Sequence, residues 1–310
     1  MTALLEKLLP VLIILAVGWI LRKRNIISGS AMNELKSIIV NVALPCLLFL
    51  SFAGTALEAK YIIIVVLVFA MCLALFFIGL LLRRKLPDTF GSIFTPWFMG
   101  GFEFGMIGIG LFAALFGSEN LQLIMLIGLG HEFFAWFVAI PYVQFKTSGR
   151  FNLIETLGRF IRTPIMLGIF GGLLVNITGL YNVLLTYFWG RSAISAMTTI
   201  SNIGVPLILM IVGYSLVIEK ENSRKIALHI IARLVPVLAI GTIVALLIRQ
   251  LVGEVDPLFN IAFYAFLILP PSYLMPVIVK DDESERHFLS QAVVYYTLVS
   301  FAGYIVLMLI

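Results

Sequence analysis

The sequence carries few charges. Lys, Arg, Asp and Glu make up 12% of its 310 residues, whereas 61% of the residues are hydrophobic and the mean hydropathy is +1.10. Soluble proteins contain about 25% charged residues, so this composition excludes a water-soluble globular protein. The only two cysteines, Cys46 and Cys72, lie inside apolar segments, which argues against a disulfide framework or a cysteine metal site. The sequence also lacks a P-loop, so we expect no ATP-driven transport by this chain alone.

What the sequence does have is long apolar runs, continuous rather than alternating with polar residues. At about 20 residues per crossing, they predict an all-α polytopic membrane protein with about ten transmembrane helices. Because Glu6 and Lys7 precede the first run and no small-residue cleavage site follows it, we interpret that run as a helix and not as a secretory signal. The predicted helices cover 5–21, 31–53, 61–82, 93–115, 121–144, 163–179, 191–217, 225–250, 258–279 and 287–310.

The basic residues are distributed unevenly among the loops. Those after the first, third, fifth and seventh runs are rich in Lys and Arg, with Arg83, Arg150 and Lys220 among them, whereas the alternate loops hold only Lys60 and Arg249. The positive-inside rule therefore places both termini on the non-cytoplasmic side of the cell membrane. The acidic loop KDDESERHF, which starts at Lys280, does not conflict with the rule, and the basic pI needs no nucleic acid partner to explain it.

A repeated motif divides the chain into halves. Asn41 and Pro45 have the spacing Asn-x-x-x-Pro, which recurs at Asn202 and Pro206. Each copy lies in the second helix of a five-helix half, and an odd number of crossings inverts the second half relative to the first. We therefore predict repeats over 1–147 and 163–310, joined by a cytoplasmic linker over 148–162. Inverted repeats of this kind are typical of secondary transporters.

The prolines of this motif predict kinks. Pro45 lacks an N–H and its ring crowds the carbonyl of Asn41, and Pro206 affects Asn202 in the same way. In hydrocarbon the freed carbonyl needs another partner, such as the asparagine amide or a neighbouring helix. Each copy thus predicts a kink with a polar patch, and a purely structural kink without a ligand is the alternative.

The fourth helix of each half contains stronger breakers. The segment MGGFEFGMIGIG, 99–110, surrounds Glu103 with five glycines, and LILPPSYLMPVI, 267–278, contains Pro270, Pro271 and Pro276. Both segments are predicted to unwind near their middle, which membrane proteins tolerate only where the backbone is buried in protein or lines a cavity. Half-helices that meet there would direct N–H groups and carbonyls at one small volume.

Four segments together resemble the auxin efflux carrier family, which includes plant PIN-type carriers and bacterial malate or malonate permease-like proteins. They are VALPCLLFLSFAG (42–54), GGFEFGMIGIGLFAALFG (100–117), NIGVPLILMIVGYSL (202–216) and LPPSYLMPVIVKDD (269–282). The resemblance implies an elevator-type transporter with inverted repeats. Helices 1, 2, 6 and 7 would form a scaffold, commonly dimeric, that includes both Asn-x-x-x-Pro kinks. Helices 3–5 and 8–10 would form a moving transport domain, in which a small organic anion binds where helices 4 and 9 cross.

The sequence departs from the family pattern at two positions. The family often has an asparagine in helix 4 and a crossover proline seven residues later, and here these positions hold Glu103 and Gly110. Glycine still permits a break, but a carboxylate beside an anionic substrate requires Glu103 to be protonated when substrate binds. The predicted substrate-binding residues are Glu103, Gly105, Gly110, Pro271, Ser272, Met275 and Pro276.

Ionisable residues inside the spans are costly and are therefore functional candidates. Burial favours the protonated form of Glu103, which makes proton coupling plausible, whereas a protonated structural glutamic acid is the alternative. His131 and Glu132 are candidates for a proton relay, although their adjacent positions point in different directions and HEFFA lacks the second histidine of a zinc protease motif. Arg233 is a candidate for neutralising a carboxylate or for compensating Glu103, with snorkelling as the alternative.

These features predict a proton-coupled secondary transporter of a small organic anion, such as a carboxylate or dicarboxylate. The alternatives are a carrier of a neutral or zwitterionic solute such as an amino acid, a sodium-coupled carrier, an uncoupled uniporter, or a channel. An enzyme is disfavoured because the sequence shows neither a clustered nucleophile and base nor a set of metal ligands. No metal or cofactor is expected. The expected partners are the substrate, a coupling proton, the lipid bilayer and a second copy bound through the scaffold.

Overall fold

The structure is a computed structural model that describes residues 2–54, 58, 60–149, 152–217, 222–253, 256–279 and 282–309. All regular elements in these ranges are helices. Seven helical stretches of the described residues are long and apolar enough to cross a membrane, or eight if a bent pair counts as one span. The prediction of an all-α polytopic membrane protein is confirmed, while the count of ten crossings stays a prediction. Arg150 of the predicted linker, Lys220, Lys280 and Asp281 lie outside the described residues.

The first predicted helix corresponds to the continuous helix α1 (Thr2–Lys23), whereas the fourth, sixth and ninth differ from a single long helix. The fourth is interrupted at residues 101–103. The sixth corresponds to α11 (Pro164–Ile177), which follows α10 (Leu153–Arg162) at a bend of 70°. The bend is at Thr163, whose hydroxyl accepts the Met166 N–H at 3.4 Å and caps α11, while Pro164 suits the first helical turn. The ninth is interrupted and is described below.

The described chain forms two compact units, each built from both halves of the sequence. Unit 1 contains Met1–Glu58, Ile109–Gln122 and Ile154–Leu216, and unit 2 contains Ala59–Gly108, Leu123–Leu153 and Val217–Ile310. The remaining elements of unit 1 are α2 (Gly29–Ile38), η1 (Ile39–Ala43), α3 (Leu44–Ala53), α7 (Ile109–Phe116), η3 (Ser118–Asn120), α12 (Leu180–Thr186) and α13 (Phe188–Ser215).

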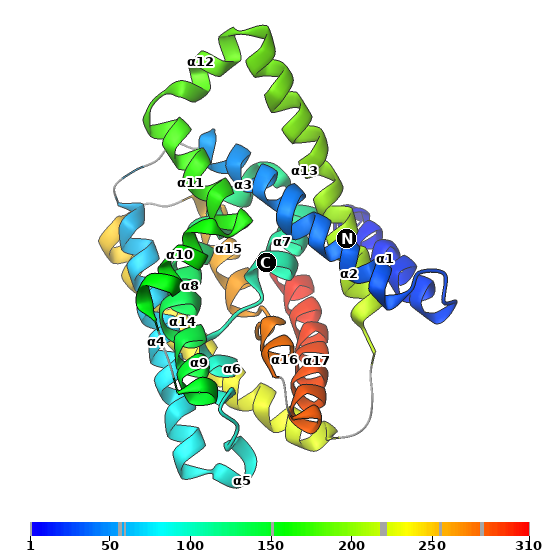
Figure 1. The fold of residues 1–310 in the computed structure, drawn as a ribbon, viewed down its shortest axis with the longest axis vertical. Helices are drawn as coiled ribbons and strands as arrows, with labels where there is room; N and C mark the ends of the chain where they lie inside the picture. The colour runs from blue at the N-terminus through cyan, green and yellow to red at the C-terminus, as the bar shows by residue number, and fades with distance from the viewer. Residues whose placement is uncertain are drawn as a thin grey trace. The chain divides into compact units, whose positions relative to one another are not determined.

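Unit 1 is held together by close backbone packing. Helix α1 packs along α13, and α3 packs along α11 (Figure 1). A Cβ added to Gly18 would lie 1.9 Å from the Met210 carbonyl oxygen, and one added to Gly168 would lie 2.5 Å from the Pro45 carbonyl oxygen. Glycine therefore lets both helix pairs approach closely, which is the usual way in which membrane helices gain contact.

The two Asn-x-x-x-Pro copies both lie in unit 1, but they differ in form. The first forms the π-helical turn η1, in which the Leu44 N–H reaches the carbonyl five residues earlier, and the Asn41 amide donates to the Ser37 carbonyl oxygen at 2.8 Å. The second leaves α13 continuous, with Pro206 inside the helix. A Cβ added to Gly204 would lie 3.6 Å from the Ala43 Cβ, so the two copies pack against each other.

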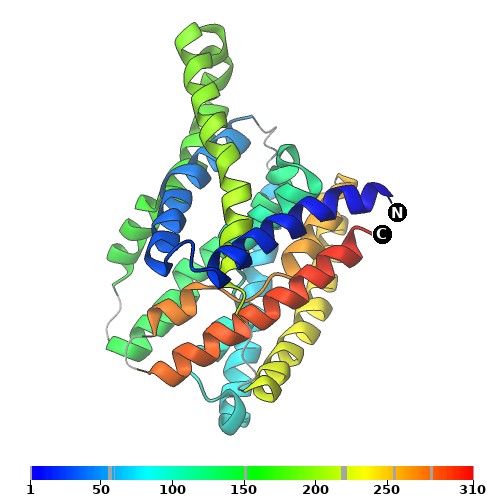
Figure 2. The same cartoon turned by 90° about the vertical axis from the view of Figure 1, so that its right-hand side faces the viewer.

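Unit 2 contains the two interrupted helices. Helix α14 contacts α4, α15 and α17, and α17 runs beside α14 in Figure 2. Helix α6 ends at Gly100 and α15 ends at Leu267, and the chain beyond each end is not helical. The elements of this unit are α4 (Tyr61–Lys85), α5 (Pro87–Phe90), α6 (Thr95–Gly100), η2 (Phe104–Gly108), α8 (Leu121–Phe134, from Leu123 on), η4 (Ala135–Ala139), α9 (Ile140–Ser148), α14 (Ser223–Val252), α15 (Pro257–Leu267), α16 (Leu274–Ile278) and α17 (Glu283–Leu307).

Candidate functional site: two unwound segments in unit 2

The candidate site consists of the two unwound segments of unit 2. The first, 101–103, is not helical and lies between α6 and η2, with Gly101 extended at φ −93° and ψ 145°. The second, 269–272, lies between α15 and α16 and contains Pro270 and Pro271, which have no N–H to donate to a helix. Both interruptions predicted from the sequence are therefore present in the described residues.

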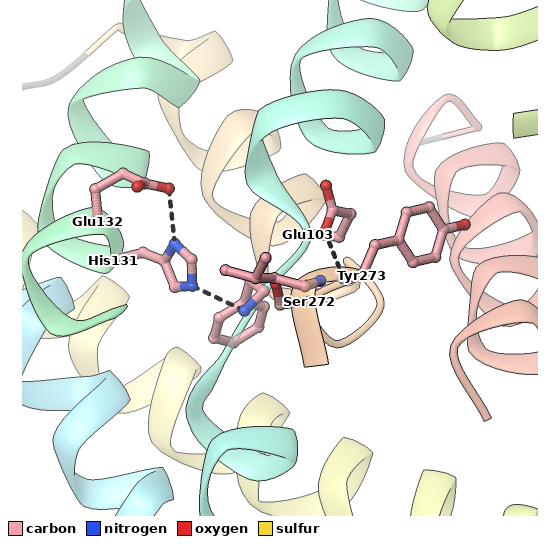
Figure 3. A network of polar contacts seen from close by, with 7 residues as sticks. Glu103, His131, Glu132, Ser272 and Tyr273 are labelled. Carbon is pink, nitrogen blue, oxygen red and sulfur yellow. Dashed lines mark hydrogen bonds and ion pairs between the residues drawn. The ribbon is translucent and has the colours of Figure 1, made fainter. Parts of the chain in front are cut away.

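Glu103 joins the two segments with its backbone and with its side chain. Its N–H donates to the Pro270 carbonyl oxygen at 2.8 Å, and its Oε2 accepts the Tyr273 N–H at 2.7 Å (Figure 3). Glu103 as a whole is only 9% exposed. The Tyr273 N–H stands just before α16, where backbone donors lack intrahelical acceptors, so a carboxyl oxygen is a suitable partner for it.

Arg233, on α14, binds the carbonyl ends of both interrupted helices. Its guanidinium donates to the carbonyl oxygens of Gly101 at 2.7 Å, Leu269 at 3.1 Å and Met99 at 3.4 Å. Its exposure is 0%, so snorkelling does not explain its position. The carbonyls at helix C-termini carry partial negative charge, and the guanidinium compensates it.

Aromatic rings cover this guanidinium. Its central carbon lies 4.6 Å from the ring centroid of Phe102 and 4.7 Å from that of Tyr296. Such cation–π contacts favour a cation in a desolvated place. Arg233 was expected to neutralise a carboxylate or to compensate Glu103, and the hydrogen bonds that the structure records for it are to backbone carbonyls.

His131 holds the first unwound segment from α8. Its Nε2 accepts the Phe102 N–H at 2.9 Å, and its Nδ1 lies 3.6 Å from Glu132 Oε1 (Figure 3). A ring nitrogen that accepts an N–H carries no proton, so the neutral ring carries its proton on Nδ1, which faces Glu132. His131 therefore contacts the predicted site and Glu132 contacts His131. The His131 ring is thus linked to Glu103 through the Phe102 peptide, whose N–H it accepts.

Hydroxyl groups of α17 hold the second unwound segment. Ser300 Oγ donates to the Ile268 carbonyl oxygen at 2.5 Å, and Thr297 Oγ1 lies 3.1 Å from Tyr273 Oη. The Tyr273 ring points away from Glu103 and toward α17 (Figure 3). The polar residues of this helix thus position the backbone N–H that Glu103 accepts.

The other predicted site residues occupy varied positions. Ser272 Oγ accepts the Leu274 N–H at 3.2 Å and closes the turn before α16, next to Pro271. Met275 is fully buried in α16, which also contains Pro276, and Gly105 lies in η2. Gly110 belongs to unit 1, where a Cβ added to it would lie 2.5 Å from Ile208 Cγ2. Its recorded close contact is thus with α13 and not with the unwound segments.

The described residues hold no group of three or more His, Cys, Asp or Glu side chains placed to bind a metal ion. The arrangement instead brings together the Glu103 carboxyl group, the Arg233 guanidinium and backbone groups of two largely buried, non-helical segments. In membrane proteins, interrupted helices of this kind bind solutes and ions. This chemistry suits the binding of a small polar solute.

Comparison with protein families decides the class. The family model described as membrane transport protein matches residues 3–308. The chain belongs to the membrane transport protein family. This is the auxin efflux carrier or PIN-like family, so the resemblance carried by the four sequence segments is confirmed. No curated protein matches the chain. As a member of the membrane transport protein family, the protein is a membrane transporter, and its family's activity is transport and not enzymatic catalysis.

Several groups at the site were not predicted from the sequence of this membrane transport protein. They are backbone groups: the Tyr273 N–H, the Pro270 carbonyl and the three carbonyls that Arg233 binds. A search for side-chain motifs cannot find them. One signal was available, since Arg233 lies in a long apolar run without any acidic residue, and a helix C-terminus is an ordinary partner for such a cation.

Proposed function

We propose that the protein is a secondary transporter that moves a small organic anion, a carboxylate, together with a proton, and that Glu103 is the coupling group. The observation that carries this proposal is the hydrogen bond from the Tyr273 N–H to Glu103 Oε2, at 2.7 Å. A backbone N–H at the start of a half-helix is the kind of donor that binds a substrate carboxylate in transporters with interrupted helices.

Glu103 and the substrate have the same chemistry toward this donor. An ionised carboxylate only accepts hydrogen bonds, whereas a protonated carboxyl group also donates one. In the empty carrier the Glu103 carboxylate accepts the Tyr273 N–H. A substrate carboxylate replaces it once Glu103 has taken up a proton, because the neutral acid no longer repels the anion and offers its O–H to it. Substrate loading then requires a proton, which couples the two fluxes.

The two compact units supply a framework for alternating access of the elevator type. Unit 2 would move and carry the site, while unit 1 would stay fixed as the scaffold. Through unit 1 the protein would bind a second copy and form a homodimer in the cell membrane. The pairing of α1 with α13 and of α3 with α11 supports an inverted repeat, because each pair combines one helix from each half. In this arrangement both termini are on the non-cytoplasmic side, as the basic loops indicate.

A second candidate is a carrier of a zwitterionic solute such as an amino acid. It is favoured by the same carboxyl group, because a Glu103 that stays ionised would bind a substrate ammonium. Uptake of amino acids that is indifferent to a proton gradient would support this candidate. Sodium-driven uptake, or saturable uptake without any gradient, would support the sodium-coupled carrier or the uniporter.

The test is uptake into proteoliposomes of labelled malate, malonate, succinate and indole-3-acetate, with and without an inward proton gradient. Wild type is compared with Glu103→Gln, which keeps an acceptor for the Tyr273 N–H but cannot exchange a proton. Glu34→Gln, an exposed glutamate on α2, is the matched control. We expect gradient-stimulated uptake in wild type and control, and only exchange in Glu103→Gln. Saturable uptake that ignores both the gradient and the Glu103 substitution would refute the proposal.

A further inference from the structure

Helix α10 presents three different faces. At about 100° per residue, Thr156 and Phe160 share one face, which is buried, and the Phe160 ring meets that of Phe170 on α11 with 6.3 Å between the centroids. The second face consists of large apolar side chains that are 42–83% exposed, namely Ile154, Leu157 and Ile161. The third face is charged and exposed, and it consists of Glu155, Arg159 and Arg162. Its centre lies about 140° around the helix from that of the exposed apolar face.

The bend at Thr163 sets the direction of α10 relative to α11. Helix α11 contains no charged residue, and α10 leaves it at 70°. Membrane-spanning helices tilt by about 20° on average, so α10 lies within about 40° of the plane of the bilayer when α11 runs across it. The cap that Thr163 provides and the contact between Phe160 and Phe170 hold this bend.

The two exposed faces of α10 restrict it to one depth. Charged side chains inside hydrocarbon are costly, so the charged face excludes α10 from the interior of the bilayer and α10 does not continue the span of α11. Exposure of the apolar face to water is also unfavourable. A helix with both kinds of face is stable in the plane of the interface, with its apolar side chains among the upper acyl chains and its charges among the headgroups.

The charges of α10 suit an acidic surface. Arg159 forms an ion pair with Glu155, so Arg162 gives the helix a net positive charge. The basic loops predict that this part of the chain faces the cytoplasm, where the leaflet carries anionic lipids. A guanidinium binds phosphate oxygens through two parallel N–H groups.

We infer that α10 is an interfacial helix that inserts Ile154, Leu157 and Ile161 into the cytoplasmic leaflet and binds the headgroup of an anionic phospholipid through Arg162. Unit 1 is thereby held at one depth in the bilayer, whichever solute the carrier moves. The chemical partner of this surface is the lipid phosphate together with the adjoining acyl chains.

The first experiment identifies the medium that touches each face. In the full chain with Cys46→Ala and Cys72→Ala, a bimane label is attached at Leu157→Cys or, on the charged face, at Glu155→Cys. The protein is placed in nanodiscs of phosphatidylcholine and phosphatidylglycerol. Doxyl groups on the lipid chains should quench the label at Leu157→Cys, and iodide in the water should quench the label at Glu155→Cys. Ile161→Cys provides a second position on the apolar face if Leu157→Cys fails to fold.

The second experiment measures the headgroup preference with the label at Leu157→Cys. Quenching by doxyl-phosphatidylglycerol is compared with quenching by doxyl-phosphatidylcholine. The preference for phosphatidylglycerol should fall by up to about fivefold in Arg162→Gln, and it should rise in Glu155→Gln, which removes the negative charge beside Arg159. Arg191→Gln removes an exposed arginine of α13 and is the matched control, which should leave the preference unchanged.

Three outcomes would overturn the inference. Quenching of the Leu157→Cys label by iodide and not by lipid means that the apolar face lies in water. Protection of this label from both quenchers means that protein, such as a second copy, covers the face. An equal preference for the two lipids before and after Arg162→Gln means that no anionic headgroup is bound. None of these readouts requires transport, so they do not depend on the proposed function.

Discussion

Both units contain helices that their sequence should break, yet the outcomes differ. In unit 1 the helix with Pro45 needs only a π-helical turn, and α13 continues through Pro206. In unit 2 the chain leaves the helix at Gly100 and at Leu267. The difference teaches that a proline alone does not unwind a membrane helix. Unwinding occurs where other side chains and backbone groups accept or supply the hydrogen bonds that the helix gives up.

The two units also use different sources of stability. Unit 1 relies on backbone contact at Gly18 and Gly168 and on local bonds such as that of Asn41. Unit 2 relies on buried polar side chains, chiefly Arg233 and His131, because an unpaired backbone group costs several kcal/mol in hydrocarbon. The comparison can be tested by removing one source at a time.

The largest effect is expected for Arg233→Gln. The substitution removes a buried cation and leaves carbonyl oxygens of Met99, Gly101 and Leu269 without their donors, at about 1–3 kcal/mol for each unsatisfied group. Thermal unfolding in detergent should show a loss of several kcal/mol. Arg191→Gln in unit 1 is the matched control, since Arg191 also donates to two carbonyls, of Leu185 and Thr186, but is exposed. Equal losses for the two variants would break the comparison.

A smaller but clear effect is expected for Gly18→Ala. The added Cβ would meet the Met210 carbonyl oxygen, so α1 must move away from α13, at about 1–3 kcal/mol. The same unfolding measurement applies, with Gly158→Ala as the control because a Cβ there has no neighbour within 4 Å. The proton stimulation of uptake by the folded protein should be unchanged. If Gly18→Ala has the free energy of unfolding of wild type but loses the proton stimulation of uptake, the assignment of different roles to the two units is contradicted.

His131→Phe should act locally on the first unwound segment. It removes the acceptor of the Phe102 N–H, which costs about 1–3 kcal/mol for an unsatisfied buried group. Hydrogen exchange at the Phe102 amide should become faster than in wild type, while the amides of α4 keep their protection. Unchanged exchange at Phe102 would contradict this role.

The smallest effect is expected for Asn41→Ala in unit 1. Its amide bonds Ser37 in an exposed part of the helix, so the loss should be about 1 kcal/mol or less. Uptake and its proton dependence should not change, as measured beside wild type in the same proteoliposomes. A strong transport defect would show that this asparagine does more than complete a helical turn.

Hydropathy and breaker residues were sufficient to predict the membrane class and both interruptions, because the bilayer restricts spanning segments to helices and prolines disrupt them. The rarity of charge in the spans also identified Glu103, His131 and Arg233 as candidates. Their partners could not be predicted, because they are backbone groups brought together by packing. Packing also could not be predicted for Gly110. It was predicted as a site residue with Glu103, whereas its recorded contact is with Ile208 in unit 1.

The central claim is that a substrate carboxylate replaces the Glu103 carboxylate only when Glu103 takes up a proton. The most direct test counts the protons bound with each substrate molecule, by calorimetry of the purified protein in buffers with different ionisation enthalpies. We predict that wild type takes up about one proton for each carboxylate bound, and that Glu103→Gln binds the carboxylate without a proton. Carboxylate binding by wild type without proton uptake would contradict the account.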